Sequence, residues 1–163
     1  MKINKDTTCC FTGHRPDKLF GYNPSSEGNL KMLRKIREII EEIINKNNVD
    51  TFITGMALGI DQWAARIVLA LKKNKYPNLK IVAAIPCTNH SSKWIKGSQL
   101  EWQDIVEQCD YVHYVSKEEY TPWCMQDRNK WMVDNSSYVI AVHDGTKGGT
   151  YNCVQYAKKK DSK

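Results

Sequence analysis

Glycines gather near the end of the chain, in residues 145–150 (GTKGGT), which contain Gly145, Gly148, Gly149 and Thr150. This stretch follows an apolar run and precedes a segment with helical spacing. Glycines allow backbone N–H groups to approach a ligand closely, and a helix start adds unpaired N–H groups and a positive dipole. The pattern therefore predicts an anion site, most naturally for phosphate, to which the hydroxyl of Thr150 can donate. A plain glycine-rich turn is the alternative interpretation.

The same stretch lacks the features of two common nucleotide motifs. No G-K-[ST] triplet follows the glycines, as a Walker A loop requires, and no G-x-G-x-x-G occurs in the chain. Ordinary dinucleotide binding is therefore not indicated, and we expect no bound cofactor. Clustered Cys and His residues at zinc-ligand spacing are also absent from the sequence, so we expect no metal.

A second glycine loop, residues 55–61 (GMALGID), contains Gly55 and Gly59 and leads into another helical segment. Asp61 falls in the first turn of that segment, where the helix dipole favours a carboxylate. Asp61 can act as a helix cap, or it can accept a hydrogen bond from a ligand hydroxyl, and the sequence leaves both roles open. We expect the loop itself to shape the pocket.

Residues 12–16 (TGHRP) follow the first apolar run and include Gly13, His14 and Arg15. The planar guanidinium of Arg15 suits a phosphate. His14 can bind a ligand, transfer a proton, or make a structural hydrogen bond within the loop. Two further residues lie just after predicted strands, and we expect them beside the same ligand; they are Pro86 and Asp144.

Arg128 and Asn129 belong to another candidate segment, residues 125–130 (MQDRNK). We expect both to contact the ligand, and a solvated helix face with Asp127 paired locally is the alternative. Tryptophans offer stacking surfaces for a base, although packing is their commoner role. The candidates are Trp94, Trp102, Trp123 and Trp131.

The elements that carry these residues alternate between strand and helix. Strands are expected at residues 7–12, 50–54, 80–85, 111–115 and 137–142. Helices are expected at residues 26–46, 60–74, 98–109, 125–135 and 149–160, the first with Ser25 or Ser26 as its N-cap. This alternation predicts an α/β fold with a doubly wound, mainly parallel sheet of about five strands, covered on both faces. In such sheets ligands bind beyond the carboxyl ends of the strands, where the candidate residues fall.

The composition predicts one globular domain over residues 1–163. The chain is 41% hydrophobic and 26% charged, and no apolar stretch approaches the ~20 residues of a membrane helix. Its first residues, MKINKDTT, lack the apolar stretch of a signal peptide, and its six cysteines form no CxxC pair. We therefore expect a cytoplasmic protein with reduced, mostly buried thiols and no membrane contact.

The formal net charge is +6, which favours a nucleic-acid interpretation at first sight. The last six residues, KKKDSK, contain four lysines and one aspartate, so they hold three of these charges. A lysine-rich end is more often a solvated helix terminus than a binding patch. Nucleic acid therefore ranks below a small ligand as the expected partner.

Taken in order, these loops resemble the SLOG superfamily, which includes the Smf/DprA proteins and the Lonely Guy phosphoribohydrolases, and they are most similar to its YpsA-like branch. The matching stretches are 9–16 (CCFTGHRP), 54–65 (TGMALGIDQWAA), 83–87 (AAIPC), 128–145 (RNKWMVDNSSYVIAVHDG) and 148–160 (GGTYNCVQYAKKK). The resemblance covers nearly the whole chain. It implies a Rossmann-like three-layer sandwich and a pocket for a nucleotide-derived ligand.

The hydrolase branch of that superfamily has a sharper pattern, roughly M-H-E-R-K-x-x-M, a strand, and then P-G-G-x-G-T-x-x-E. Residues 125–132 (MQDRNKWM) follow its first part and align Arg128 with the functional arginine, and residues 148–150 match the end of the glycine motif. The glutamate that ends this pattern has no counterpart after Thr150 in this sequence. Cleavage of an N-glycosidic bond builds up positive charge that a carboxylate stabilises, so hydrolysis needs a substitute such as Asp61 or Asp127.

We therefore expect the protein to bind a small nucleotide-derived ligand, a nucleoside phosphate or a signal resembling ADP-ribose or cyclic ADP-ribose, and to sense or sequester it. The alternative is a nucleotide N-glycosidase or phosphoribohydrolase with Arg128 and Asp61 as catalytic residues. A further alternative is single-stranded DNA binding, by analogy with Smf/DprA. The resemblance also implies a homo-oligomer, with aromatic residues of 111–123 as its expected contact. The expected ligand contacts are Gly13, His14, Arg15, Gly55, Gly59, Asp61, Pro86, Arg128, Asn129, Asp144, Gly145, Gly148, Gly149 and Thr150.

Overall fold

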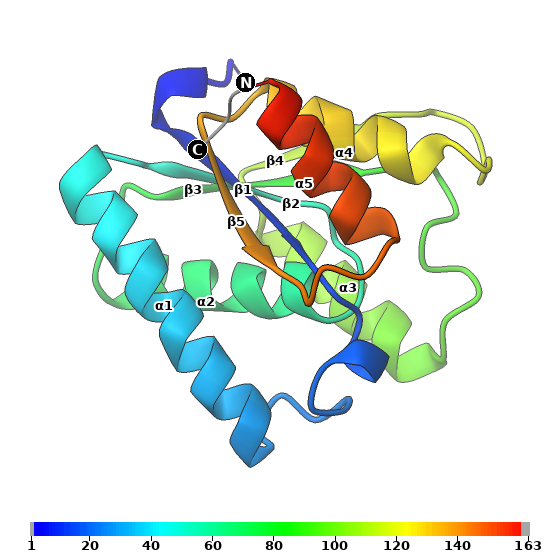
Figure 1. The fold of residues 1–163 in the computed structure, drawn as a ribbon, viewed down its shortest axis with the longest axis horizontal. Coiled ribbons are helices and arrows are strands. Elements are labelled where there is room, and N and C mark those ends of the chain that lie inside the picture. Colours follow the sequence, from blue (N-terminus) through cyan, green and yellow to red (C-terminus); the bar gives the residue numbers. More distant parts are fainter. Residues whose placement is uncertain (1, 161–163) are drawn as a thin grey trace.

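Five parallel strands form one sheet in the computed structural model, which describes residues 2–160 (Figure 1). The strands are β1 (Thr8–Gly13), β2 (Thr51–Thr54), β3 (Lys80–Ile85), β4 (Tyr111–Tyr114) and β5 (Tyr138–Val142). Their order across the sheet is β4-β3-β2-β1-β5, and each neighbouring pair runs parallel. The strand order therefore reverses at β1, which pairs with β2 on one side and with β5 on the other.

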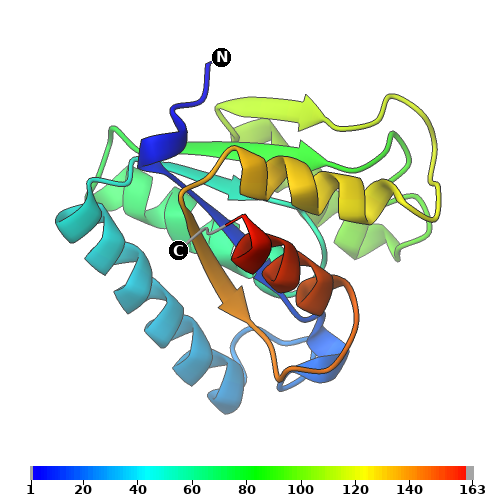
Figure 2. The same cartoon turned by 45° about the horizontal axis from the view of Figure 1, so that its top comes forward.

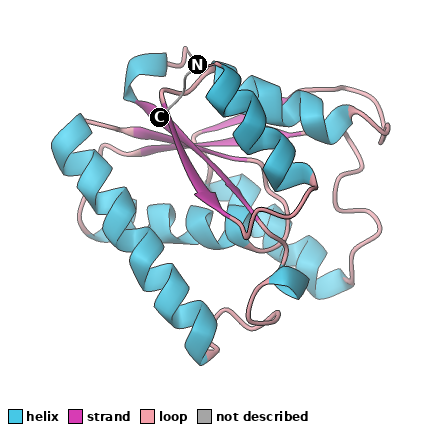
Figure 3. Ribbon diagram, viewed as in Figure 1, coloured by secondary structure: helices cyan, strands magenta, loops and turns pink. Residues whose placement is uncertain are grey.

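Helices cover both faces of this sheet (Figure 3). Three lie on one face, α1 (Glu27–Asn47), α2 (Ile60–Asn74) and α3 (Lys96–Gln108), and two pack side by side on the other, α4 (Cys124–Asp134) and α5 (Gly149–Lys159) (Figures 1 and 2). The preference for right-handed crossovers explains this division, because the chain steps in one direction from β1 to β4 and then returns to β5. The predicted doubly wound sandwich is confirmed. Within residues 2–160, no helix combines the length and apolar character that crossing a bilayer requires.

The predicted element boundaries lie within two residues of the observed ones. The residue before α1 is Ser26, but its hydroxyl donates to the carbonyl oxygen of Phe20 instead of capping the helix. The sequence pattern does not predict two short 3₁₀ helices, η1 (Lys5–Thr7) and η2 (Pro16–Lys18). Of the lysine-rich end, residues 158–160 finish α5 and follow it, and residues 161–163 lie outside the described part of the chain.

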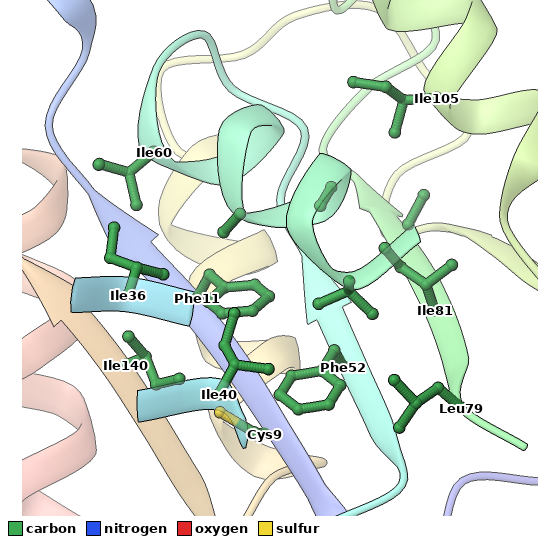
Figure 4. Packing of buried hydrophobic residues seen from close by; sticks show 14 of the residues in the cluster. Cys9, Phe11, Ile36, Ile40, Phe52, Ile60, Leu79, Ile81, Ile105 and Ile140 are labelled. Atoms are coloured by element: carbon green, nitrogen blue, oxygen red, sulfur yellow. The ribbon is translucent and has the colours of Figure 1, made fainter. Parts of the chain in front are cut away.

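The strands supply side chains to two separate cores, because successive residues of a strand point to opposite faces. Cys9 and Phe11 of β1 face the core beneath α1 and α2, where the rings of Phe11 and Phe52 stack with centroids 5.6 Å apart (Figure 4). Cys10 faces the second core, beneath α4 and α5. Because both faces are buried, β1 and β2 read as nearly continuous apolar runs, as strands of covered parallel sheets do.

All six cysteines are free, and all except Cys109 are buried. Burial raises the pKa of the Cys109 thiol to about 12 and that of Cys153 to about 11, and it raises the pKa of Cys10 further. These thiols are therefore neutral at pH 7 and pack as small apolar groups, as the sequence predicts for most of them.

The carboxyl ends of the strands meet at one edge of the sheet, and the chain diverges there. It leaves β1 toward α1 on one face and leaves β5 toward α5 on the other. A backbone hydrogen bond of 3.1 Å, from the N–H of His14 to the carbonyl oxygen of Val142, holds the two strand ends together. Diverging connections of this kind leave a crevice between them, which is where open α/β sheets bind ligands.

Candidate functional site

A pocket of about 280 Å³ occupies this crevice. The end of β1 with η2, the loop after β2, the start of α4 and the loop before α5 all contribute to its wall. Its volume is just below the roughly 300–1,000 Å³ typical of small-molecule sites. The predicted ligand contacts that line it are Gly13, His14, Arg15, Asp61, Arg128, Asn129, Gly148, Gly149 and Thr150.

The other predicted contacts lie around the pocket without lining it. Most of them support residues that do line it, as described below, whereas Pro86 is buried at the end of β3 and Gly145 forms an exposed turn with φ of +86°. This set comprises Gly55, Gly59, Pro86, Asp144 and Gly145.

Several lining residues are absent from the sequence prediction. Four of them lie within the motifs quoted above but were not singled out there as ligand contacts. Asp17 and Lys18 are different, because the 3₁₀ helix η2 turns them back over the pocket and no sequence pattern indicates that helix. The added lining residues are Thr12, Asp17, Lys18, Ala57, Met125 and Thr146.

Two glycines let the β1 loop lie directly against the start of α2. Gly59 precedes α2 with φ of +92°, and a Cβ at this position would come within 2.5 Å of the carbonyl oxygen of His14. A Cβ at Gly13 would collide with the side chain of Ile60. Side chains at either position would push the two loops apart, so these glycines set the width of the crevice.

Arg128 is buried and anchored from two sides. Its Nη1 donates to the carbonyl oxygen of Gly55 at 2.6 Å, and its Nε donates to Oδ1 of Asn129 at 3.1 Å. Asn129 in turn donates through Nδ2 to the carbonyl oxygen of Gly149 at 3.3 Å. This chain of bonds joins the β2 loop, α4 and the start of α5. The solvated-face interpretation therefore fails for Arg128 and Asn129, although Asp127 is exposed.

Asp61 contributes a buried carboxylate to the same pocket, with only 4% of the residue exposed. Its Oδ2 accepts a hydrogen bond from the backbone N–H of Ala57 at 3.3 Å, whereas its Oδ1 has no hydrogen-bond partner within residues 2–160. Burial raises the pKa of Asp61 to about 6, against the opposing effects of Arg128, the Ala57 N–H and Arg15. The carboxylate caps the β2 loop with one oxygen and leaves the other free.

His14 meets Asp144 across the pair β1 and β5. Its Nε2 lies 3.0 Å from both the backbone nitrogen and Oδ1 of Asp144. The backbone N–H donates to an unprotonated Nε2, while Oδ1 accepts only from a protonated one. A ring nitrogen carries either a lone pair or a proton, so the tautomer of His14 decides which of these two bonds forms.

Asp144 also organises the glycine loop that follows it. The hydroxyl and the backbone N–H of Thr146 donate to its Oδ1 at 2.6 and 3.0 Å. These bonds, together with His14, hold the pKa of the Asp144 carboxyl well below its usual value. The hydroxyl of Thr146 lies 3.5 Å from Nζ of Lys18, which brings a cation to the rim of the pocket.

The start of α5 presents unpaired backbone donors to the pocket. The first backbone hydrogen bond of the helix runs from the N–H of Asn152 to the carbonyl oxygen of Gly148 at 2.9 Å. The N–H groups of Gly149, Thr150 and Tyr151 precede it and therefore have no partner within the helix. With the helix dipole behind them and Arg15 and Lys18 nearby, they can hold an anion.

None of the four predicted tryptophans lines the pocket. The indole N–H of Trp102 donates to Nδ1 of His90 at 3.2 Å, and Trp94 packs edge-on against the same histidine. Trp131 stacks on His113 with ring centroids 4.1 Å apart, and Trp123 is exposed at the start of α4. Trp94, Trp102 and Trp131 therefore pack against neighbouring side chains, which is the commoner role of tryptophan.

The architecture and the glycine loops define a Rossmann-like α/β protein with a crevice at the reversal of strand order. The YpsA family model, described as the YspA SLOG family, matches residues 9–163. The chain therefore belongs to this family.

Two relatives illustrate the family. The protein is 39% identical over 141 residues to the uncharacterized SPbeta prophage-derived protein YoqJ of Bacillus subtilis, an alignment that covers 80% of this chain and 82% of YoqJ. It is 30% identical over 156 residues to a UPF0398 protein of Brevibacillus brevis, covering 93% of this chain and 81% of the relative.

The fold is also similar to that of DNA processing protein A from Helicobacter pylori, whose structure concerns a single-stranded DNA binding mode. The TM-score is 0.65 with 18% sequence identity, and the superposition covers 97% of this chain. This chain spans 63% of the length of that protein, so the likeness concerns the shared α/β fold.

Proposed function

We propose that the pocket binds a phosphorylated, nucleotide-derived small molecule. The phosphate would lie against the first turn of α5, with Arg15 and Lys18 as its cationic partners, and the remainder of the ligand would face Asp61. One observation carries the proposal: four segments distant in the sequence converge on a single small pocket that combines free helix N–H groups with cationic side chains. The expected use of such a pocket is to sense or sequester a signal molecule such as ADP-ribose or a cyclic derivative.

Calorimetric titration with AMP, ADP-ribose and inorganic phosphate tests this proposal. Arg15 is exposed, so Arg15→Ala should leave the fold intact while it removes a charge-assisted bond to the phosphate. Such a bond is worth about 1.5–3 kcal/mol, so we expect AMP affinity to fall about tenfold or more. Lys147→Ala is the matched control, since Lys147 is an exposed cation of the loop before α5 that does not line the pocket. Equal affinity in all three proteins would place the ligand elsewhere.

The position of the hydrolase glutamate supports binding over cleavage. In the pattern G-T-x-x-E, that position corresponds to Cys153, which is fully buried in the core beneath α5. Its thiol, with a pKa raised to about 11, is neutral at pH 7 and supplies no negative charge to an oxocarbenium-like centre. Asp61 is the buried carboxylate that lines the pocket, and the exposed Asp17 is a second carboxylate in its wall. Chromatography after incubation with AMP tests for the N-glycosidase alternative, because cleavage releases free adenine.

Single-stranded DNA binding is the second candidate, favoured by the fold shared with DNA processing protein A. A strand would place one of its phosphates at the start of α5 in the position assigned to the nucleotide phosphate. Fluorescence anisotropy with a thymidine oligonucleotide tests it, because affinity should fall with salt at a logarithmic slope of about −0.7 per phosphate contact. Arg15→Ala should reduce that slope, and AMP should displace the strand. An effect confined to Lys158→Ala and Lys159→Ala would indicate nonspecific attraction to the end of α5.

The expected self-association rests on three exposed aromatic side chains in segment 111–123. These are Tyr114, Tyr120 and Trp123, which are 41%, 60% and 63% exposed. Light scattering at two protein concentrations tests this part of the proposal, with Trp123→Ser as the variant expected to shift the mass toward a monomer.

A further inference from the structure

Asp61 carries one carboxylate oxygen that the protein does not satisfy. More than nine-tenths of the residue is buried. Its Oδ2 accepts a hydrogen bond from the Ala57 N–H, and its Oδ1 has no hydrogen-bond partner among the described residues. An ionised carboxylate only accepts hydrogen bonds, and a buried acceptor without a donor is costly. Oδ1 itself is buried in the free protein, so a ligand supplies the missing donor by turning the carboxylate toward the pocket that Asp61 lines.

The chemistry of that donor follows from its surroundings. Arg128 and Arg15 already place positive charge near Asp61, and both act to lower its pKa. A neutral donor therefore completes the site better than a further cation. The start of α5 lines the same pocket of about 280 Å³, so the group that faces Asp61 must be close to the bound anion. In a nucleotide, the sugar is the part that adjoins the phosphate, and its donors are hydroxyl groups.

We propose that the pocket selects a phosphorylated ribose with free hydroxyls, and that Oδ1 of Asp61 accepts a hydrogen bond from one of them. This inference rests on the proposed function and narrows its ligand class. A nucleotide within a DNA strand has no 2′-hydroxyl, and its 3′-oxygen is esterified, so it offers no donor to Asp61. The pocket thus favours a free ribonucleotide over an internal DNA nucleotide.

A ligand series tests the selection without any variant. AMP, 2′-deoxy-AMP, 3′-deoxy-AMP and 2′,3′-dideoxy-AMP carry the same base and phosphate and differ only in the hydroxyls. We expect the dideoxy compound to bind wild-type protein about tenfold or more weakly than AMP, since a hydrogen bond to a buried charged acceptor is lost. The two single-deoxy compounds identify which hydroxyl faces Asp61.

A variant then assigns the selection to Asp61. In Asp61→Asn the amide oxygen can still accept from the Ala57 N–H, but the charge is removed, so the ratio between AMP and dideoxy-AMP affinity should fall to about threefold or less. Asp127→Asn is the matched control, because Asp127 is an exposed aspartate of α4 that does not line the pocket. It should leave the ratio as in wild type.

The outcomes separate the two proposals. If AMP binds but dideoxy-AMP binds equally well, or if Asp61→Asn keeps the full wild-type ratio, ribose selection by Asp61 is wrong and the proposed function stands. If neither AMP nor ADP-ribose binds to folded protein, the proposed function fails and this inference fails with it.

Discussion

Two aspartates follow two strands at the same edge of the sheet, and the fold treats them in opposite ways. Asp144, in the loop after β5, is exposed and accepts bonds from Thr146 while it also contacts His14. Asp61, at the start of α2, is buried and has one oxygen without a partner. The pKa of Asp144 is lowered and that of Asp61 is raised.

The difference separates a residue that shapes the pocket from one that is available to a ligand. The acceptors of Asp144 are used within the protein, where they fix the turn that leads into the glycine loop. Asp61 retains an unused acceptor that is buried, an arrangement that opposes stability unless a ligand completes it. Strained or unsatisfied groups of this kind are more typical of functional sites than of structural ones.

The largest expected effect comes from Arg128→Met, which removes the buried cation near Asp61. The carbonyl oxygen of Gly55 and Oδ1 of Asn129 lose their donors, and Asp61 loses its main compensating charge. We expect unfolding in urea at pH 7 to require about 2–4 kcal/mol less free energy. The loss should be smaller near pH 4, where Asp61 is protonated.

Lys130→Met serves as the control, since Lys130 is exposed two residues further along α4. The double variant Arg128→Met/Asp61→Asn sharpens the assignment, because it should recover part of the lost stability. If it recovers none at pH 7, the interaction between Arg128 and Asp61 is not what stabilises the pocket.

Asp61→Asn should have the next largest effect, and it should stabilise the free protein at neutral pH. The pKa of Asp61 is about 6 in the folded state, above the ~3.9 of an unfolded chain, so the folded state holds its proton more tightly. Wild-type stability from this group is present below pH 4 and is lost as the pH rises through 6. The variant has no titrating group at this position and does not lose this stability, so we expect its free energy of unfolding at pH 7.5 to exceed that of wild type by about 2 kcal/mol.

Urea denaturation at pH 4 and at pH 7.5 measures this gain, which should be much smaller at the lower pH. An equal effect at both values would mean that Asp61 titrates normally. Saturation with AMP should narrow the gain at pH 7.5, because the ligand supplies the missing donor only to wild type.

Asp144→Ala should have the smallest effect. The residue is exposed, so the bonds from Thr146 are weakened by solvent, and we expect the melting temperature at pH 7 to fall by only a few degrees. Since its pKa is lowered by folding, its contribution is present above pH 4 and disappears as the pH falls. Asp127→Ala, an exposed residue of α4, is the control for thermal denaturation. A loss as large as that of Arg128→Met would remove the contrast between the two aspartates.

Much of the fold followed from patterns of local origin. Apolar runs alternating with amphipathic segments were enough for the strands and helices, and parallel topology brings their carboxyl ends to one edge by necessity. The glycine loops at residues 55–61 and 145–150 were recognisable because glycine before a helix has few other uses. The place of Gly148, Gly149 and Thr150 in the pocket wall was therefore an expectation that needed no coordinates.

The roles of individual side chains were beyond such patterns. Gly55 and Gly59 were expected to contact the ligand. The carbonyl oxygen of Gly55 instead accepts a hydrogen bond from Arg128, and the absence of a side chain at Gly59 leaves space for the carbonyl oxygen of His14. Lys18 reaches the pocket only because η2 turns the chain back. His14 and Asp144 are 130 positions apart, and nothing in either motif indicates that they meet.

The amino-acid sequence by itself determined the order of elements, the doubly wound class of fold, the family, and the segments that would supply a pocket. Those properties depend on periodicity and on glycine placement, which act over a few residues. Only the tertiary structure decided which of two similar aspartates is satisfied and which is left with a free acceptor. Burial and hydrogen bonding depend on groups brought together across the sheet, and a carboxylate gains its raised or lowered pKa only from that assembled environment.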